Sequence, residues 1–512
     1  MKKINADIVV YGGSLGGVLA AYSSAHSGKK VVLFEETDWI GGQLTSQAVP
    51  PDEHKWIEET GCTASYRTYR NKVRNYYRSH PFIIDELKTK DFFCPGGSSV
   101  SRLSHPPKLA LRFLTEMIQP CLDNGNLTIY YHAKLKAADT VGNEIRSVTV
   151  ACDGETYLAE GKYFLDGSDE GELIAKSGCE YVTGAESKEM TGEPSAADVY
   201  MLQDRQPVTW TLAFENRLKG DYVIDKPVEY ERFRKLMTPY DNYPVFSMYG
   251  PDSSTGKAKR FGMYNGEYDE KGNKLFGLYT YRRIVNAAHF KDGAEPYDVT
   301  LLNWPQNDYF LGNTFDCENA EENREMAKQL TLSFFYWLQT EAPNGDKKGY
   351  PFFRACGEAV GTEDGMTKAY YVRESRRILS KFTVRETDVT EGGNPDFYDS
   401  VGVGSYPIDL HITTQTNSFF YKPSLRFTIP LGAMIPVRIT NLIPACKNIG
   451  ATHLTGGCYR LHPVEWNVGE SAGLLATYAL DNRLLPGEIR ENRMQLQRFQ
   501  EFLQSNGIQL HW

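Results

Sequence analysis

The chain has 512 residues, 41% of them apolar, and its formal net charge is −9. That length exceeds what one hydrophobic core usually organises, so we expect more than one folding unit. The acidic balance and the absence of a long basic run argue against a nucleic-acid-binding face. No apolar stretch is long enough for a membrane span.

The N-terminus leads from a few basic residues directly into an apolar run, without the apolar core and cleavage site of a signal peptide. Nine cysteines are scattered along the chain with no Cys-x-x-Cys pair, which predicts free thiols in a reducing compartment. We therefore expect a cytoplasmic protein. No residue spacing typical of a metal site stands out.

The first informative stretch is DIVVYGGSLGGVLAAYSSAHSGKKVVLFEE. It predicts a buried strand over 7–11, a glycine-rich turn, a helix over 18–27 and a second strand over 30–34. This order is typical of a dinucleotide-binding unit, in which the helix N-terminus faces a pyrophosphate. The middle glycine of the fingerprint is replaced by Ser14, whose hydroxyl can donate a hydrogen bond to a phosphate oxygen.

An acidic residue and a glycine doublet narrow the choice of dinucleotide. Glu35 ends the second strand, where a carboxylate accepts hydrogen bonds from a ribose and disfavours a 2′-phosphate. FAD and NAD share this fingerprint. The doublet Gly41-Gly42 lets the chain double back beside an extended cofactor, which favours FAD.

The next segments predict one helix and a β-meander. Residues 98–121 carry an apolar stripe typical of a helix. Residues 126–166 alternate apolar and polar side chains, with turn signals at Gly142-Asn143 and Asp153-Gly154. We expect a three-stranded meander that returns to the nucleotide-binding sheet at residues 164–166.

From residue 187 the composition shifts to aromatic residues, prolines and short strands, with one clear helix near 318–341. We interpret this region as the substrate side. The predicted organisation is a first part of the FAD-binding domain over 1–186, an inserted substrate or cap region over 187–436, a C-terminal part of the FAD-binding domain over 437–485 and a helical tail over 486–512.

A second informative block covers residues 441–482. It predicts a strand over 441–446, a glycine-rich loop and a helix that starts with Pro463, which has no N–H to leave unpaired. Gly469, Ala472 and Gly473 form a small-residue stripe that would allow close packing against the β-sheet or a flat ligand. The N-terminus of this helix would direct its free N–H groups at an anion such as the pyrimidine edge of reduced flavin.

Together with these blocks, the segments GGQLT, FLDGSDEGEL, VSRLSHPPKLAL, GAESKEMTGEP, LLNWPQNDY, YVRESRRI, SVGVGSYPIDLH and GCYRLHPVEWNVGESAG resemble the bacterial FAD-dependent oxidoreductase family of the glutathione-reductase-like superfamily. The resemblance spans about residues 5–482. It implies an α/β fold: a Rossmann-like FAD-binding domain, with a parallel sheet and a three-stranded β-meander, and an inserted α+β substrate domain. It does not imply a particular substrate.

The resemblance also implies cofactor-binding positions. In this sequence they fall on Gly12, Gly13, Ser14, Leu15, Gly16 and Gly17 for the phosphates, Glu35 for the ribose, Gly42, Gln43, Leu44 and Thr45 beside the flavin, Gly167 and Ser168 by backbone contact, and Arg460, Leu461 and His462 at the flavin edge. Asp169 stands where the family usually has a glycine, so we expect no cofactor contact from it.

Histidine suits the proton transfer that accompanies hydride transfer, because its pKa lies near working pH. Our first candidate base is His411 in YPIDLH, with Asp409 on the same face if that stretch is extended. The second is His453 on the glycine-rich loop, whereas we expect His462 to be fixed by the helix start.

For four other polar residues, the sequence is compatible with either a substrate-binding role or a structural role. Asn303 and Asn307 in LLNWPQNDY would bind a substrate hydroxyl or stabilise a buried turn. Arg373 and Arg376 in YVRESRRI would position substrate or, as we favour, form salt bridges.

We thus expect a FAD-dependent oxidoreductase that transfers hydride between flavin N5 and a small polar substrate, such as a sugar or related polyhydroxylated compound of carbohydrate metabolism. The alternatives are a redox-neutral elimination or isomerisation that uses flavin transiently, an NAD-dependent dehydrogenase, and a flavoprotein that only binds a partner. The sequence leaves open the substrate, the electron acceptor, the oligomeric state and whether the flavin is covalently attached.

Overall fold

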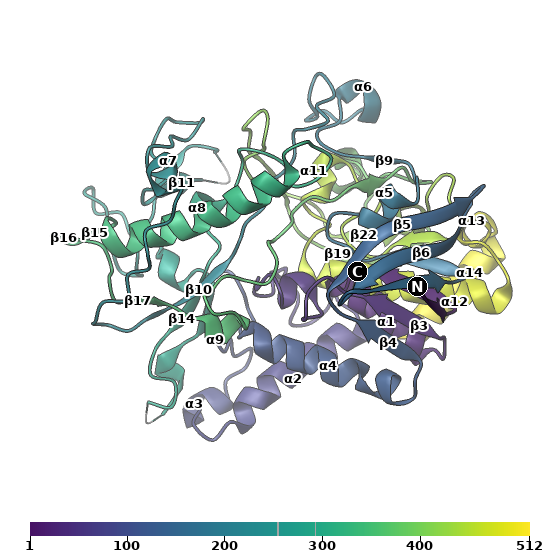
Figure 1. The fold of residues 1–512 in the computed structure, drawn as a ribbon, viewed down its shortest axis with the longest axis horizontal. Coiled ribbons are helices and arrows are strands. Elements are labelled where there is room, and N and C mark those ends of the chain that lie inside the picture. The colour runs from purple at the N-terminus through teal and green to yellow at the C-terminus, as the bar shows by residue number, and fades with distance from the viewer. Residues whose placement is uncertain (253–254, 292) are drawn as a thin grey trace.

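The computed structural model describes residues 1–252, 255–291 and 293–512. Figure 1 shows two halves side by side, with both chain termini in one half and the long helix α8 in the other. The strands are β1 Lys2–Asn5, β2 Ile8–Tyr11, β3 Val31–Phe34, β4 Leu127–Tyr130, β5 Ala133–Val141, β6 Glu144–Cys152, β7 Glu155–Glu160, β8 Tyr163–Asp166, β9 Tyr181–Val182, β10 Leu212–Asn216, β11 Tyr249–Pro251, β12 Ala258–Arg260, β13 Arg283–Val285, β14 Val299–Leu302, β15 Pro343–Asn344, β16 Lys347–Lys348, β17 Phe353–Ala355, β18 Arg377–Ile378, β19 Ser400–Gly404, β20 Ile408–Leu410, β21 Phe420–Lys422, β22 Phe427–Pro430 and β23 Leu442–Pro444.

The helices lie between groups of these strands in the chain and at its C-terminal end. They are α1 Leu15–His26, α2 Ala64–Ser79, α3 Asp85–Lys88, α4 Pro107–Asp123, α5 Glu172–Lys176, α6 Lys188–Thr191, α7 Tyr230–Arg234, α8 Ala320–Thr340, α9 Gly357–Val360, α10 Glu386–Val389, α11 His453–Gly456, α12 His462–Asn482, α13 Pro486–Glu491 and α14 Arg493–Ser505. No helix in the described ranges is both long and apolar enough to cross a bilayer.

A five-stranded parallel sheet in the order β23-β8-β2-β3-β4 organises the first half. Its central strands β8, β2 and β3 are buried at every position because both faces of the sheet are covered. The sheet joins segments from both ends of the chain, so one domain is assembled around the rest of the sequence. This arrangement confirms the predicted α/β fold class with a parallel sheet.

The predicted meander is present as β5, β6 and β7, which pair antiparallel in that order. Its two turns fall at the predicted positions: Gly142 has φ +63°, and Asp153 and Gly154 have φ +47° and +79°. Positive φ at tight hairpin turns favours such residues. Strand β1, which the sequence did not suggest, adds to β7 in parallel.

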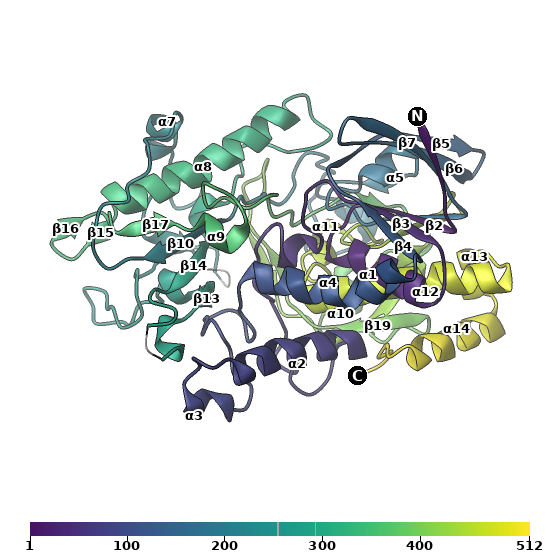
Figure 2. The same cartoon turned by 60° about the horizontal axis from the view of Figure 1, so that its bottom comes forward.

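Helices α1 and α12 pack against each other beside this sheet, as Figure 2 shows. Their contact depends on glycine. A Cβ atom on Gly469 would lie 2.2 Å from the carbonyl oxygen of Gly16, and one on Gly473 would lie 2.3 Å from that of Ala20. Gly469 and Gly473 therefore pack on helix α1, whereas the sequence had suggested the β-sheet or a flat ligand.

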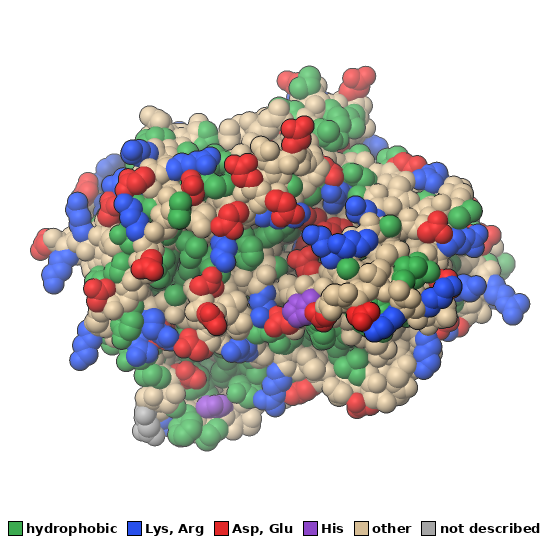
Figure 3. All heavy atoms as spheres, in the orientation of Figure 1, with side chains coloured by type: hydrophobic (Ala, Val, Ile, Leu, Met, Phe, Trp, Pro, Cys, Tyr) green, Lys and Arg blue, Asp and Glu red, His purple; other side chains and the backbone are tan. Residues whose placement is uncertain are grey.

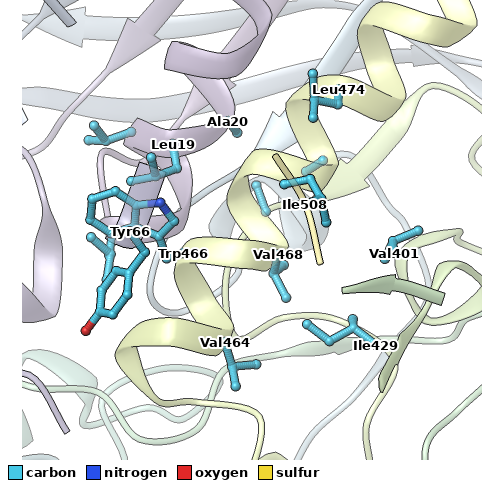
Figure 4. Packing of buried hydrophobic residues seen from close by; sticks show 14 of the residues in the cluster. Leu19, Ala20, Tyr66, Val401, Ile429, Val464, Trp466, Val468, Leu474 and Ile508 are labelled. Atoms are coloured by element: carbon cyan, nitrogen blue, oxygen red, sulfur yellow. The ribbon is translucent and has the colours of Figure 1, made fainter. Parts of the chain in front are cut away.

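The opposite side of α12 packs on β19 and on side chains of the C-terminal tail. Figure 4 shows Val464 and Val468 of α12 with Val401, Ile429 and Ile508 around them. Residues 384–435 therefore share the hydrophobic core of the parallel sheet, although they lie far from its strands in the sequence.

Trp466 of α12 faces the other way, toward α2. Its ring meets the ring of Tyr66 edge-on with centroids 5.1 Å apart. Its Nε1 donates a hydrogen bond to Ser65 Oγ at 2.7 Å. Helix α2 is thereby fixed against the start of α12.

The second half has its own core around an antiparallel sheet in the order β13-β14-β10-β17, covered by α8. Its core is rich in aromatic residues: the ring of Phe214 contacts those of Tyr279, Phe335 and Phe353 with centroids 5.0–5.6 Å apart. The predicted helix near 318–341 is α8. This unit is the α+β insertion of the expected fold class.

Several predicted boundaries need correction. The helix expected over 18–27 begins at Leu15, because Ser14 caps it. The helix expected over 98–121 begins only at Pro107, since Pro106 and Pro107 end the irregular segment before it. The strand expected over 441–446 is limited to β23. All nine cysteines are unpaired, as predicted.

Candidate active site

The glycine-rich turn after β2 forms the start of α1. Gly12 has φ +92°, and a Cβ atom there would lie 2.2 Å from the backbone nitrogen of Ser168. Ser14 is the N-cap of α1, and its Oγ accepts a hydrogen bond from Gly17 N at 3.2 Å. The hydroxyl keeps its own hydrogen for a second partner. Serine at this fingerprint position therefore still offers a donor to a phosphate.

Two backbone donors of this turn lack a protein partner. Within the described ranges, the N–H groups of Ser14 and Leu15 make no hydrogen bond, although both residues are buried. The N–H groups of Gly13 and Gly16 instead donate to glutamate side chains from other segments. Free N–H groups at the start of a helix are suited to an anion.

A cavity of about 760 Å³, counting the space open to solvent, lies at the carboxyl ends of β2, β3 and β8. Ligands of open parallel sheets bind at this edge. Residues of the second half close over it: Tyr370 donates to Glu170 Oε1 at 2.7 Å, and Arg324 Nη2 donates to Glu170 Oε2 at 3.1 Å. Figure 3 shows acidic side chains in the recess between the two halves.

Glu35 lines this cavity directly after β3. Its carboxylate accepts hydrogen bonds from Gly13 N at 2.8 Å and from Thr37 Oγ1 at 2.6 Å. Burial raises the pKa of Glu35, and these bonds oppose the rise. The carboxylate thus stands beside the phosphate loop with lone pairs left, as a ribose acceptor requires.

The glycine doublet packs directly on the phosphate loop. Gly41 N donates to the carbonyl oxygen of Gly13 at 2.8 Å. Gly42 has φ +46°, and a Cβ atom on it would lie 2.8 Å from Ser14 Cα. The chain doubles back here as the sequence predicted.

The turn that follows the doublet carries two buried glutamines. Gln43 Nε2 donates to Glu465 Oε2 at 2.5 Å, and Gln47 Nε2 donates to Asp169 Oδ2 at 2.7 Å. Because each amide nitrogen faces a carboxylate, the orientation of both amides is fixed. Each Oε1 is buried and has no donor among the described residues. Leu44 and Thr45 complete this turn, and the Thr45 hydroxyl donates to Ile40 O at 2.5 Å.

Asp169, at the position where a glycine was expected, belongs to a buried ionic network. Lys447 Nζ contacts Asp169 Oδ1 and lies 3.4 Å from Glu465 Oε2. These carboxylates keep the Lys447 ammonium charged: burial alone would lower its pKa, but their charges raise it well above the usual value. Lys447, which the sequence analysis missed, therefore links the β8 loop to the start of α12.

Gly167 and Ser168 line the cavity, but their backbone N–H groups are already used. Gly167 N donates to Tyr11 O at 2.8 Å, and Ser168 N donates to Asp166 Oδ1 at 2.9 Å. A cofactor contact from these two residues would use other atoms.

Helix α12 begins after Leu461, whose side chain makes no capping bond. The N–H groups of His462 and Val464 have no hydrogen-bond partner among the described residues. The His462 ring is fixed by main-chain groups: Nδ1 accepts from Asp52 N, and Nε2 donates to Val49 O, both at 3.1 Å. Burial lowers the pKa of His462 to about 3, so the ring is neutral. His462 is fixed at the helix start, as expected.

These features together fit an extended dinucleotide. Unpartnered N–H groups stand at the starts of α1 and α12, and the two orphaned amide oxygens of Gln43 and Gln47 lie on the turn that joins these regions. A cofactor with anionic phosphates, hydroxyl donors and a polar ring edge would satisfy all of them. FAD has each of these groups.

His411 lies immediately after β20 and is paired with a residue of the second half. Its Nδ1 lies 2.6 Å from Asp308 Oδ2. The predicted partner Asp409 is farther away, with Oδ2 3.8 Å from His411 Nε2. The His411 side chain is 26% exposed, whereas that of Asp308 is 2% exposed. The structure therefore adds a buried orienting carboxylate that the sequence analysis missed.

Asp308 is anchored on its other oxygen. Arg373 Nη2 donates to Asp308 Oδ1 at 2.9 Å, and Thr209 Oγ1 donates to it at 2.5 Å. Burial would raise the pKa of Asp308, but Arg373 and His411 lower it to about 2. Burial and the Arg373 charge lower the pKa of His411. At neutral pH the pair is thus a carboxylate and a neutral imidazole.

Two further arginines lie near this pair, each beside an aspartate. Arg460 Nη1 donates to the Tyr371 hydroxyl at 2.8 Å, and its Nη2 lies 3.5 Å from Asp409 Oδ2. Arg282 Nη1 lies 3.4 Å from Asp52 Oδ2. The region offers many hydrogen-bond donors and acceptors with balanced charge.

The remaining polar candidates have structural roles. Asn307 is fully buried, accepts from Trp304 N at 2.8 Å and donates to Trp210 O at 3.0 Å, which fixes a turn. Asn303 contributes a weak bond of 3.5 Å to Thr211 Oγ1. Arg376 forms a two-armed salt bridge with Asp316, as favoured from the sequence.

His453 forms a second histidine–carboxylate pair. Its Nδ1 lies 3.0 Å from both carboxylate oxygens of Glu374. Burial opposes protonation, but the Glu374 charge raises the pKa of His453 above its usual value. His453 lines a different cavity from Glu35.

The sequence matches the model of the family described as FAD dependent oxidoreductase over residues 7–503. No curated protein matches the chain. Among solved structures, p-nitrophenol 4-monooxygenase PnpA from Pseudomonas putida DLL-E4 is 10% identical over 99% of this chain and 89% of its own, with a TM-score of 0.38. A geranylgeranyl bacteriochlorophyll reductase-like protein from Thermoplasma acidophilum is 8% identical over 99% and 85%, with a TM-score of 0.32. L-proline dehydrogenase from P. horikoshii is 13% identical over 37% and 25%, with a TM-score of 0.19, so the match spans a quarter of that protein.

Proposed function

Since the chain belongs to the FAD-dependent oxidoreductase family, we propose that it oxidises or reduces a small polar substrate with His411 as the group that moves the proton. One observation supports this most directly. His411 Nδ1 is held 2.6 Å from the buried Asp308, while its Nε2 makes no hydrogen bond among the described residues.

The proposed proton transfer follows from the tautomer. Ionised Asp308 can only accept a hydrogen bond, so neutral His411 carries its hydrogen on Nδ1 and a lone pair on Nε2. In the oxidative direction Nε2 takes the hydroxyl proton of the substrate. FAD, when bound, supplies the two-electron chemistry, hydride exchange at flavin N5. Asp308 stabilises the imidazolium that results.

For the cofactor we propose the residues predicted from the sequence, except that Arg460, which lies beside Asp409, is assigned to the substrate. Ser14 and Leu15 would hold phosphate oxygens, Glu35 the ribose, and Gln43 with the N–H groups at the start of α12 the flavin side. Their unpartnered donors and acceptors support this assignment. The chain belongs to a family of FAD-dependent enzymes, and this membership disfavours the NAD-dependent alternative.

For the substrate we propose a sugar or related polyhydroxylated compound, in carbohydrate metabolism. Arg282 beside Asp52 and Arg460 beside Asp409 supply donors and acceptors in nearly neutral pairs. Several neutral hydroxyls would use both kinds of group, whereas a purely apolar substrate would leave them unpaired. The free cysteines support a reducing, cytoplasmic location.

Anaerobic titration of the FAD-loaded protein with sugars and hydroxy acids tests the proposal. A substrate should bleach the flavin absorbance stoichiometrically in the wild type, and at least 100-fold more slowly in His411→Gln. Turnover without bleaching would favour the redox-neutral elimination or isomerisation instead. Equal bleaching rates in both proteins would overturn the role of His411.

A further inference from the structure

Residues 367–372, which we call the strap, run along the cavity beside the phosphate loop, called the cofactor cavity from here on. Their side chains in the cavity wall are Ala369, Tyr370 and Val372. The strap belongs to the second half of the molecule, because its main chain is bonded to residues just before β10. Thr367 N donates to Thr211 O at 2.9 Å, and Tyr371 N donates to Thr209 O at 2.8 Å. The second half therefore supplies part of the wall of a cavity whose phosphate loop belongs to the first half.

One end of the strap contacts the first half near the glycine doublet. The N–H groups of Lys368 and Ala369 both donate to Ser46 O, at 3.0 and 3.1 Å. Lys368 Nζ lies 2.8 and 3.0 Å from the two carboxylate oxygens of Asp38, and 5.1 Å from the centroid of the Trp39 ring. Neither Lys368 nor Asp38 is among the described residues that line the cofactor cavity. This ion pair thus holds the strap without forming part of the wall.

The other end of the strap contacts Glu170, which lies in the loop after β8 and is 7% exposed. The Tyr370 hydroxyl donates to Glu170 Oε1 at 2.7 Å. Thr314 Oγ1 donates to the same oxygen at 2.6 Å, and Arg324 Nη2 donates to Oε2 at 3.1 Å. Hydrogen bonds to an ionised carboxylate are stronger than those between neutral groups. All three donors come from the second half, so Glu170 joins the two halves at the cofactor cavity.

The two contacts stand at different parts of the cavity wall. Ser46 follows the glycine doublet that packs on the phosphate loop, and Glu170 follows β8. A dinucleotide held at the phosphate loop would therefore be enclosed between the first half and the strap. We propose that the strap retains FAD, and that both contacts must break before FAD enters or leaves the cavity. This rests on the cofactor assignment proposed above and is independent of His411 and of the substrate.

Retention by a strap has a kinetic signature that a direct contact to the cofactor lacks. A weaker contact between the strap and the first half lets the cavity open more often, both with and without FAD. The rate constants of association and dissociation then both rise, and Kd changes less than either. Loss of a direct contact to FAD raises the dissociation rate constant alone.

Lys368→Met removes the ion pair that lies outside the cavity wall. Stopped-flow quenching of FAD fluorescence by the apoprotein measures association, and dilution of the FAD-loaded protein measures dissociation. Both rate constants should rise at least fivefold. The matched control is Lys226→Met: Lys226 Nζ lies 2.5 Å from Glu231 Oε1 and 5.3 Å from the centroid of the Tyr230 ring, within the second half. Both of its rate constants should stay within twofold of the wild type.

Tyr370→Phe removes the hydroxyl that reaches Glu170 and provides a second test if Lys368→Met impairs folding. It should also raise both rate constants at least fivefold. Its control, Tyr350→Phe, loses a hydroxyl that donates to Pro343 O at 2.7 Å within the second half, and should stay within twofold. A rise in dissociation alone, or equal rates in variants and controls, would overturn the strap and leave the cofactor assignment intact. An apoprotein that binds no FAD would overturn that assignment, and the strap with it.

Discussion

Asp308 Oδ2 lies 2.6 Å from His411 Nδ1, although the two residues are 103 positions apart in the chain. A second pair has nearly the same geometry: His511 Nδ1 lies 2.7 Å from Asp396 Oδ1, but both side chains are more than half exposed. The two pairs differ mainly in burial, and only the buried one is anchored by an arginine. The role proposed for His411 depends on that difference, because a buried and anchored carboxylate can orient the imidazole whereas an exposed one cannot.

Asp308→Asn should therefore lower kcat by about 10²- to 10⁴-fold, because an amide no longer fixes the Nδ1–H tautomer of His411. KM and the bound-flavin spectrum should change little. Steady-state kinetics with the substrate found by anaerobic screening measures this. Asp396→Asn, the matched control, should keep kcat within twofold. Equal losses in the two variants would show that the effect is not tied to the His411 site.

The pH dependence should report the charge on His411. The imidazole must be neutral to accept a proton, and its pKa is lowered below the usual 6.5 by burial and by Arg373. In the oxidative direction kcat/KM should therefore fall on the acid side with a midpoint below 6.5.

Arg373→Met should move this midpoint to higher pH, because the cation that disfavours the protonated ring is gone. Arg373→Lys should keep the midpoint near its original position while losing part of kcat through poorer anchoring of Asp308. A profile of kcat/KM from pH 4.5 to 9 measures both. An unchanged midpoint in the methionine variant would contradict the electrostatic role of Arg373.

The elements that can be predicted well from the sequence are those whose boundaries depend on residues close together in the chain. The glycine-rich turn after Tyr11 follows a buried strand and leads into α1, and Pro463 marks the start of α12 within one residue. Hydrophobic periodicity and helix-start chemistry act over a few residues, so a single sequence reveals them.

The missed residues make contacts that no local pattern encodes. Asp308 stands one position after Asn307, in a motif that the sequence did single out, but only the fold shows that the asparagine fixes the turn and the aspartate reaches His411. The role of Lys447 likewise depends on its ion pair with Asp169, which lies 278 positions away in the sequence. The sequence signal that could have identified Asp308 is its acidic side chain directly after the predicted polar residue Asn307.

The glycine doublet gives a prediction about cofactor binding alone. Gly42→Ala would place a Cβ atom 2.8 Å from Ser14 Cα and displace the phosphate loop. The Kd for FAD should rise at least tenfold, measured as quenching of FAD fluorescence by the apoprotein. Gly125→Ala is the control: its φ is also positive, +69°, but no atom lies within 4 Å of the added Cβ. If both substitutions weaken FAD equally, backbone strain rather than the contact with the loop is responsible.

Lys447 should be required for the cofactor site to stay assembled in the apoprotein. Its ammonium stands between Asp169 and Glu465, so Lys447→Met would leave the buried Glu465 and the partly buried Asp169 without a counter-charge. Removing one partner of a buried ion pair costs about 3–5 kcal/mol, and urea unfolding of the apoprotein measures it. Lys3→Met is the control, since Lys3 lies 3.5 Å from Glu160 on the surface with both side chains largely exposed, and such pairs contribute about 0–1 kcal/mol. Adding Asp169→Asn to Lys447→Met should recover part of the lost stability, because it removes one of the unpaired charges. A Lys447→Met protein that unfolds at the same urea concentration as the Lys3→Met control would show that the network does not stabilise the cofactor site.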